Sequence, residues 1–146
     1  MKALTLYQPW ATLVTYGVKC IETRTWPTAY RGPLVIHASK NVRYMPHLLV
    51  LLHRGQIPPE VSDLPYPTGA LLGEACLIHC APAAWFLQGP DGIAAQEQAL
   101  GDYGRGRWGW VFREARPYER AEPWRGRQGL WTLDRHKDTD NERLRS

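Results

Sequence analysis

Three charged side chains lie close together in residues 17–24 (GVKCIETR), directly after an apolar segment. If residues 20–24 form a strand, Glu22 and Arg24 point to the same face, about 6–7 Å apart at Cα. Lys19, at the strand mouth, can turn toward them. Two cations and one carboxylate favour an anionic or polar ligand. The structural alternative is a surface ion pair between Glu22 and Arg24, worth about 0–1 kcal/mol, with Lys19 solvated.

The same cluster has one catalytic interpretation. Lys19 acting as a general base or nucleophile would need a lowered pKa. Burial and Arg24 would lower its pKa, whereas Glu22 would raise it. The cluster therefore favours binding over catalysis, and Lys19 and Glu22 are candidate catalytic residues only if the protein is an enzyme.

Aromatic side chains accompany arginines just after this segment. Trp26 lies in a predicted loop with Tyr30 and Arg31, close to Arg24. Aromatic rings among arginines form stacking surfaces for nucleobases, worth about 1–3 kcal/mol per base. The alternative for Trp26 is simple packing of the loop.

Other chemistry-bearing residues give weaker signals. On an extended strand Cys76 and Cys80 lie about 13 Å apart, with His79 on the opposite face, so no metal site is predicted. His37, on a buried strand, is typical of a core histidine. The loop 101–107 lacks the Lys-Ser/Thr pair of a phosphate-binding loop, and no cofactor is expected.

Charge is distributed unevenly over the 146 residues. Residues 1–60 hold seven basic and two acidic side chains, a net charge of +5, and the remainder holds 11 basic and 12 acidic, a net of −1. A basic half favours contact with a polyanion. No apolar run approaches the ~20 residues that span a bilayer. The three cysteines form no even-numbered disulfide framework, so we expect a cytoplasmic protein.

The pattern of apolar residues and turn formers predicts the elements that position these groups. Strands are expected at 2–7, 20–24, 34–38, 69–80 with a kink at Gly73, 107–113 and 129–133. Helices are expected at 10–16, 43–54 and 93–100, and a proline-rich loop at 55–68. We expect one α+β domain over residues 1–135, a mixed sheet curled toward a barrel, with loops 25–33 and 101–107 as site walls. Residues 136–146 are expected to form a flexible charged tail.

Three motifs together resemble a known family. They are Gln8-Pro9-Trp10-Ala11, the G-x-K-x-x-E-x-R pattern of residues 17–24, and Tyr30-Arg31-Gly32 followed by Ile36-His37-Ala38. They strongly resemble the ASCH (activating signal cointegrator homology) domain, over about residues 3–134. The resemblance implies a PUA-like β-barrel whose cleft recognises RNA or a modified nucleoside. By this implication Lys19, Glu22 and Arg24 line the cleft, with Trp10, Arg31 and Ser39 near it.

The resemblance also implies an enzymatic alternative. Some small bacterial relatives deacylate 4-acetylcytidine with a Lys and a Thr of the motif and a Glu beyond it. Lys19 matches the Lys, Glu22 occupies the Thr position, and Thr23 is one residue away, on the other face of the strand. Glu74 is a candidate for the third residue. For a ribonuclease, Lys19, Arg24 and His37 are candidates for the base and the phosphate-stabilising group.

Three functions are thus carried forward. The first is a module that binds single-stranded RNA or a base flipped from it, with Trp26 or Tyr30 stacking on the base. The second is a hydrolase of a modified nucleoside or of RNA. The third is a protein-interaction module with a vestigial cleft. No membrane partner is expected, and the sequence does not indicate an oligomeric state.

Overall fold

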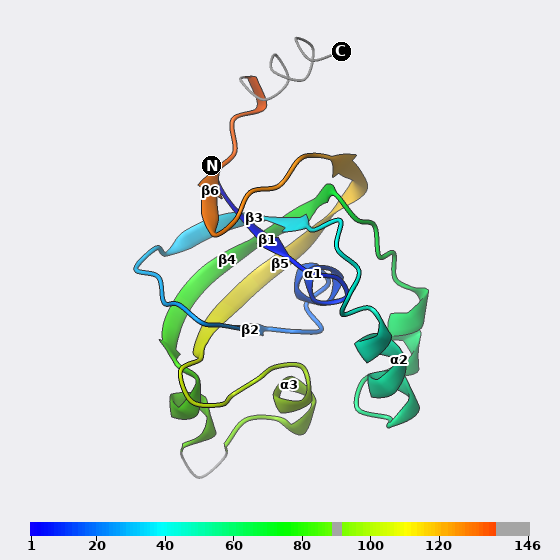
Figure 1. Ribbon diagram of the computed structural model, residues 1–146, viewed down its shortest axis with the longest axis vertical. Helices are drawn as coiled ribbons and strands as arrows, with labels where there is room; N and C mark the ends of the chain where they lie inside the picture. Colours follow the sequence, from blue (N-terminus) through cyan, green and yellow to red (C-terminus); the bar gives the residue numbers. More distant parts are fainter. Residues whose placement is uncertain (89–91, 137–146) are drawn as a thin grey trace.

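A computed structural model describes residues 1–88 and 92–136, and its centre is one mixed six-stranded sheet (Figure 1). The strand order is β2-β5-β4-β3-β1-β6. The strands are β1 Lys2–Leu6, β2 Ile21–Arg24, β3 Gly32–Ala38, β4 Ala70–Pro82, β5 Trp108–Pro123 and β6 Leu130–Thr132. The helices are α1 Trp10–Thr15, α2 Pro46–His53 and α3 Ala95–Ala99, with 3₁₀ turns η1 Pro59–Asp63 and η2 Ala83–Leu87.

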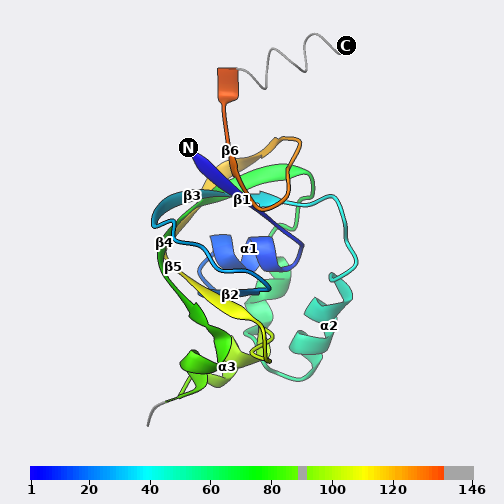
Figure 2. The same cartoon turned by 60° about the vertical axis from the view of Figure 1, so that its left-hand side comes forward.

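The sheet curves around α1 but stays open. β1 and β3 are parallel, and the other paired strands are antiparallel. In the described ranges no ladder joins β2 to β6, so the expected barrel is not closed. We attribute this to α1, whose residues 11–15 are all buried and fill the inside of the curve (Figure 2), and to the shortness of the two edge strands.

Apolar residues on both faces of the central strands explain their position in the sheet. Leu4, Leu34 and Ile36 belong to a core cluster that includes α1. Ala3 and Val35 join Trp131 in a second cluster. Because both faces are covered, β3 carries the continuous apolar run Leu34–Ile36, as parallel strands usually do.

The β4–β5 ribbon differs most from the sequence-based expectation. β5 continues to Pro123, ten residues beyond the predicted end. The kink at Gly73 is confirmed: the register shifts between Leu71 and Gly73, and a Cβ at Gly73 would lie 2.3 Å from the Arg116 carbonyl oxygen. The second half of β5 is largely exposed and rich in charges, so its sequence lacks the apolar alternation that predicts a strand.

The helices agree with prediction in number and order. α2 starts later than expected, at Pro46, and η1 lies within the predicted proline-rich loop. None of the described helices is long and apolar enough to cross a membrane. Within the described ranges no group of three His, Cys, Asp or Glu side chains is placed to hold a metal ion. Most of the predicted tail, residues 137–146, lies outside the described residues.

Candidate nucleic-acid interface

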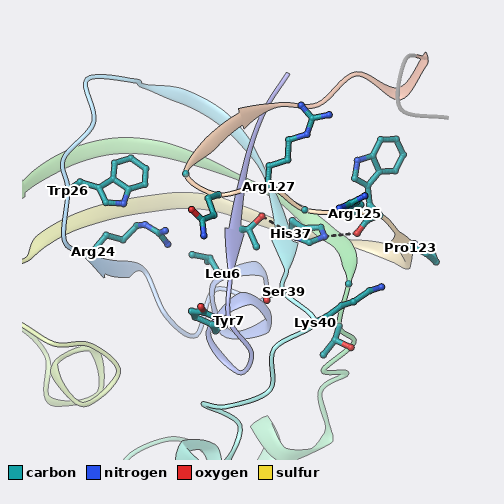
Figure 3. Close-up of a pocket in the computed structure, with 17 residues that line it drawn as sticks. Leu6, Tyr7, Arg24, Trp26, His37, Ser39, Lys40, Pro123, Arg125 and Arg127 are labelled. Carbon is teal, nitrogen blue, oxygen red and sulfur yellow. Dashed lines mark hydrogen bonds between the residues drawn. The ribbon is translucent and has the colours of Figure 1, made fainter. Parts of the chain in front are cut away.

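Two adjoining hollows open where β1 and β2 end. The large hollow, about 1420 Å³, lies among the end of β1, residues 37–40 and residues 123–129 (Figure 3). The small hollow, about 590 Å³, lies among the start of α1, β2 and residues 99–102. Tyr7, Arg24 and Trp26 line both. We call the two hollows together the cleft.

The large hollow is cationic. Arg24, Lys40, Arg125 and Arg127 line it, and none of its described lining residues is an Asp or Glu. Figure 3 shows Arg24 on one side and Arg125 on the other, with His37 between them. Cations gathered around one concavity concentrate positive potential there, which attracts anions.

His37 forms the floor of the large hollow and is held on both ring nitrogens. A carbonyl oxygen only accepts, so His37 Nε2–H donates to the Trp124 oxygen, at 2.7 Å. Nδ1 then accepts from the Thr5 hydroxyl at 3.2 Å, and Thr5 accepts from Trp131 Nε1 at 3.1 Å. Burial lowers the pKa of His37, so the ring is neutral near pH 7. The histidine is a core anchor for the loop after β5.

Arg24 links the two hollows. Its guanidinium carbon lies 5.2 Å from the Trp26 ring centroid and 5.8 Å from that of Trp110, within cation–π range. The two rings meet edge to face at 4.7 Å, and Trp110 Nε1 donates to the Trp26 carbonyl. Arg24 is the only described basic residue that lines both hollows.

Glu22 faces the small hollow and is nearly buried. It pairs across the sheet with Trp110, and Arg24 pairs with Trp108, so both charges lie on one face as predicted. Glu22 is 8% exposed, and its buried Oε2 has no hydrogen-bond partner in the part of the chain that the structure describes. The alternative of a surface ion pair does not hold: no contact within 4 Å joins Glu22 to Arg24 in the described residues.

Lys19 lies behind the wall of the small hollow. It is 1% exposed, its Nζ donates to the Leu100 carbonyl, and it lies 5.4 Å from the Trp10 ring centroid. Burial lowers the pKa of Lys19, whereas Glu22 and Glu97 raise it, and burial is the larger effect. Lys19 is not among the described lining residues of either hollow, and a role for it in ligand binding stays a prediction.

Glu97 on α3 holds the motif segment in place. Its carboxylate accepts from the backbone N–H of Cys20 at 3.0 Å and of Ile21 at 2.8 Å. Gln96 Nε2 donates to the Val18 carbonyl at 3.3 Å. Together with the Lys19–Leu100 bond, these contacts join the 96–100 segment to the strand that carries Glu22. The sequence gives no signal for them because the partners are about 77 residues apart.

Glu97→Gln should lower the free energy of unfolding by about 1–3 kcal/mol, because the amide keeps one acceptor oxygen and turns an NH₂ donor toward backbone N–H groups. Gln98→Ala is the matched control: its side chain is exposed on the same helix, and it should change stability by less than about 0.5 kcal/mol. Urea unfolding measures both. Equal stability of Glu97→Gln and wild type would contradict the stabilising role of the Glu97 hydrogen bonds.

The remaining predicted residues fall into two groups. Trp10 lines the small hollow and Ser39 the large one. Tyr30 and Arg31 line neither: the Tyr30 hydroxyl donates to the Pro33 carbonyl, and Arg31 donates to the carbonyls of Thr28 and Tyr30. Of loop 25–33, only its first two residues reach the cleft.

The two further residues of the hydrolase alternative, Glu74 and Thr23, lie in different parts of the structure. Glu74 bonds Arg116 at 2.9 Å on the surface, outside both hollows. Thr23 lines the small hollow, and its hydroxyl accepts a hydrogen bond from the Asp102 N–H of the 101–107 loop. That loop does form a wall, as predicted, through Gly101, Asp102 and Arg107.

Comparison with known proteins gives consistent matches. The family model described as the ASCH domain matches residues 4–124. Activating signal cointegrator 1 is 31% identical over 139 residues in mouse and 30% identical over 138 residues in human. Each alignment covers 90% of this chain and 22% of the relative, so the chain spans about a fifth of those proteins.

Solved structures share the fold. The crystal structure of ASCH from Zymomonas mobilis superposes with a TM-score of 0.56 at 16% identity, over 98% of this chain and 94% of that one. A point variant of the same bacterial protein gives a TM-score of 0.54 at 15% identity, over the same shares of the two chains.

Proposed function

Since this chain belongs to the ASCH domain family, we propose that it binds single-stranded RNA, or a modified nucleoside within it, through the cleft. Backbone phosphates occupy the large hollow and one nucleobase enters the small hollow. The observation that carries the proposal is the large hollow itself, with four cations and no acidic residue among its described lining. It adjoins an aromatic-walled hollow at Arg24 and Trp26.

The two hollows match the two parts of a nucleotide: the large one is cationic and suits the phosphate, and the small one is aromatic and suits the base. Cations attract phosphates irrespective of the nucleotide sequence, and the large hollow is lined by cations. The small hollow has Trp10, Tyr7 and Trp26 in its lining and a volume of about 590 Å³, in the usual range for small-ligand pockets. A base reaches such walls only when it is unstacked, which favours single-stranded RNA over a duplex.

Salt dependence tests the phosphate assignment. The dissociation constant for a short single-stranded RNA should rise steeply with salt, with a log–log slope of about 0.7 per contacted phosphate. Lys40→Ala removes one cation of the large hollow and should reduce this slope by about 0.7. Fluorescence anisotropy at several salt concentrations measures it.

Lys2→Ala is the matched control for that experiment. Lys2 is also a lysine, but it lies outside both hollows and donates to the Thr132 hydroxyl. Its replacement should leave the slope unchanged. Equal slopes for Lys40→Ala and wild type, or no RNA binding at low salt, would contradict the proposal.

A hydrolase is the second candidate function, because Lys19 is a buried amine with a lowered pKa near Glu22. Against it, Nζ is bonded to the Leu100 carbonyl and Glu74 lies outside the cleft. Incubation with 4-acetylcytidine or RNA, followed by chromatography, tests it. Product formation that a folded Lys19→Met variant abolishes would favour the hydrolase over the binding module.

A further inference from the structure

Three buried polar atoms around the small hollow have no hydrogen-bond partner among the described residues. Among the described residues, Oε2 of Glu22 accepts no hydrogen bond and Nε of Arg24 donates none. Nε of Arg107 also donates none, although Asp102 Oδ2 lies 3.9 Å from it. All three residues line the small hollow. Buried polar groups are nearly always hydrogen-bonded, so such a set needs an explanation, and a ligand with the complementary pattern supplies one.

Glu22 differs from the other acid of this hollow. Asp102 is exposed, accepts from the Gly104 N–H at 2.9 Å and lies 3.9 Å from Arg107 Nε. Glu22 is 8% exposed, and its Oε2 accepts no hydrogen bond from the described residues. It is therefore the carboxylate that is available to a ligand.

A carboxylate has two oxygens that only accept, so it pairs best with two adjacent N–H donors. Guanine presents such a pair on its Watson–Crick edge, N1–H beside the 2-amino group. Adenine and cytosine present one amino group next to a ring nitrogen lone pair, which repels the second oxygen. Uracil presents one N–H between two carbonyl oxygens. Guanine alone of the four bases matches Glu22 with both oxygens.

We propose that the small hollow selects guanine, with Glu22 accepting from N1–H and the 2-amino group. The inference rests on the proposed RNA-binding function and adds the identity of the base. The donors of Arg24 and Arg107 suit the remaining edge of guanine, whose O6 and N7 are acceptors that arginine commonly reads. Arg107 is positioned for this by its own bond from Nη2 to the Thr23 carbonyl, at 3.0 Å.

Pentanucleotides that differ only in the central base separate this selectivity from phosphate binding. The central base is guanine, hypoxanthine, adenine or cytosine within a run of uridines, and affinity is measured by fluorescence anisotropy. Hypoxanthine is guanine without the 2-amino group, so it loses one hydrogen bond to a charged acceptor. We expect the guanine oligomer to bind about tenfold or more tightly than the hypoxanthine oligomer.

Glu22→Gln tests the residue. Its amide offers one acceptor and one donor, so the guanine-to-hypoxanthine ratio should fall to near unity, with folding checked by circular dichroism. Glu74→Gln makes the same substitution outside the cleft and should retain the ratio. Equal affinity for all central bases, or a ratio that Glu22→Gln leaves intact, would overturn the guanine assignment alone. Absence of binding to every pentanucleotide would overturn the proposed function as well.

Discussion

Replacing Arg24 with alanine should weaken binding of short single-stranded RNA by about 10–100-fold. Arg24 is the described cation common to both hollows, and its guanidinium lies against Trp26 and Trp110. Its loss removes a charge-assisted hydrogen bond to the ligand, worth about 1.5–3 kcal/mol. It also leaves the Trp26 ring without the cation that lies over it. Anisotropy titrations at fixed salt measure the change.

Two further variants sharpen this expectation. Arg24→Lys keeps the charge but not the planar group that stacks on tryptophan, so its affinity should fall between those of wild type and Arg24→Ala. Arg113→Ala is the control. Arg113 is exposed and lies outside both hollows, and its side chain donates a hydrogen bond to the carbonyl of its neighbour Phe112. A folded Arg24→Ala protein with unchanged affinity would remove Arg24 from the binding surface.

The strand of the motif was predictable because its signals are local. Alternation along residues 20–24 places Glu22 and Arg24 on one face, and the register with β5 confirms it. Gly73 also gives a local signal, because a glycine inside a strand pattern marks a bulge or a close backbone approach. The cause of that approach is not local: the Arg116 carbonyl of β5 excludes a side chain at Gly73.

The other walls of the cleft depend on contacts between distant segments. Arg125 and Arg127 reach the large hollow because His37 anchors the loop through the Trp124 carbonyl, 87 residues away. Nothing in the sequence around those arginines indicates this pairing. Arg31 is the converse case: the resemblance implies a place near the cleft, but Arg31 lines neither hollow, and its Nη1 donates to the carbonyls of Thr28 and Tyr30.

The structure places Lys19 behind the wall of the small hollow. The prediction assumed that close charges share a solvent-facing surface. The 96–100 segment instead covers Lys19 and supplies the Leu100 carbonyl as its acceptor. Tertiary packing from a short helix thus decides whether this amine can reach a ligand, and the sequence of residues 17–24 does not contain that information.

This burial gives Lys19→Ala the largest expected effect on stability, a loss of about 3–5 kcal/mol. The substitution leaves a cavity where the aliphatic stem packs, removes the donor to the Leu100 carbonyl and takes a cation from between Glu22 and Glu97. Domains of this size have about 5–15 kcal/mol in total, so a fraction of the variant would unfold during an assay. Urea unfolding, followed by tryptophan fluorescence, measures the loss.

Lys19→Met separates the contribution of the aliphatic stem to stability from that of the ammonium charge. Methionine fills most of the space, so it should recover about 2 kcal/mol relative to alanine. The pH dependence then isolates the ammonium. Burial lowers the pKa of Lys19 in the folded state below 10.5, so between these two pKa values the unfolded chain binds more protons and stability rises with pH. The wild type should therefore gain stability relative to Lys19→Met across that window.

The informative quantity is the difference in the free energy of unfolding between wild type and Lys19→Met, because other groups titrate in the same pH range. Burial raises the pKa of Tyr66 to about 12, so stability is lost above pH 10 in both proteins, and the subtraction removes this effect. A difference that stays flat with pH would contradict the buried, desolvated amine. If the difference rises as expected and Lys19→Met still binds RNA, Lys19 supports the wall of the small hollow. Loss of RNA affinity in Lys19→Ala then reports unfolding and carries no evidence for catalysis.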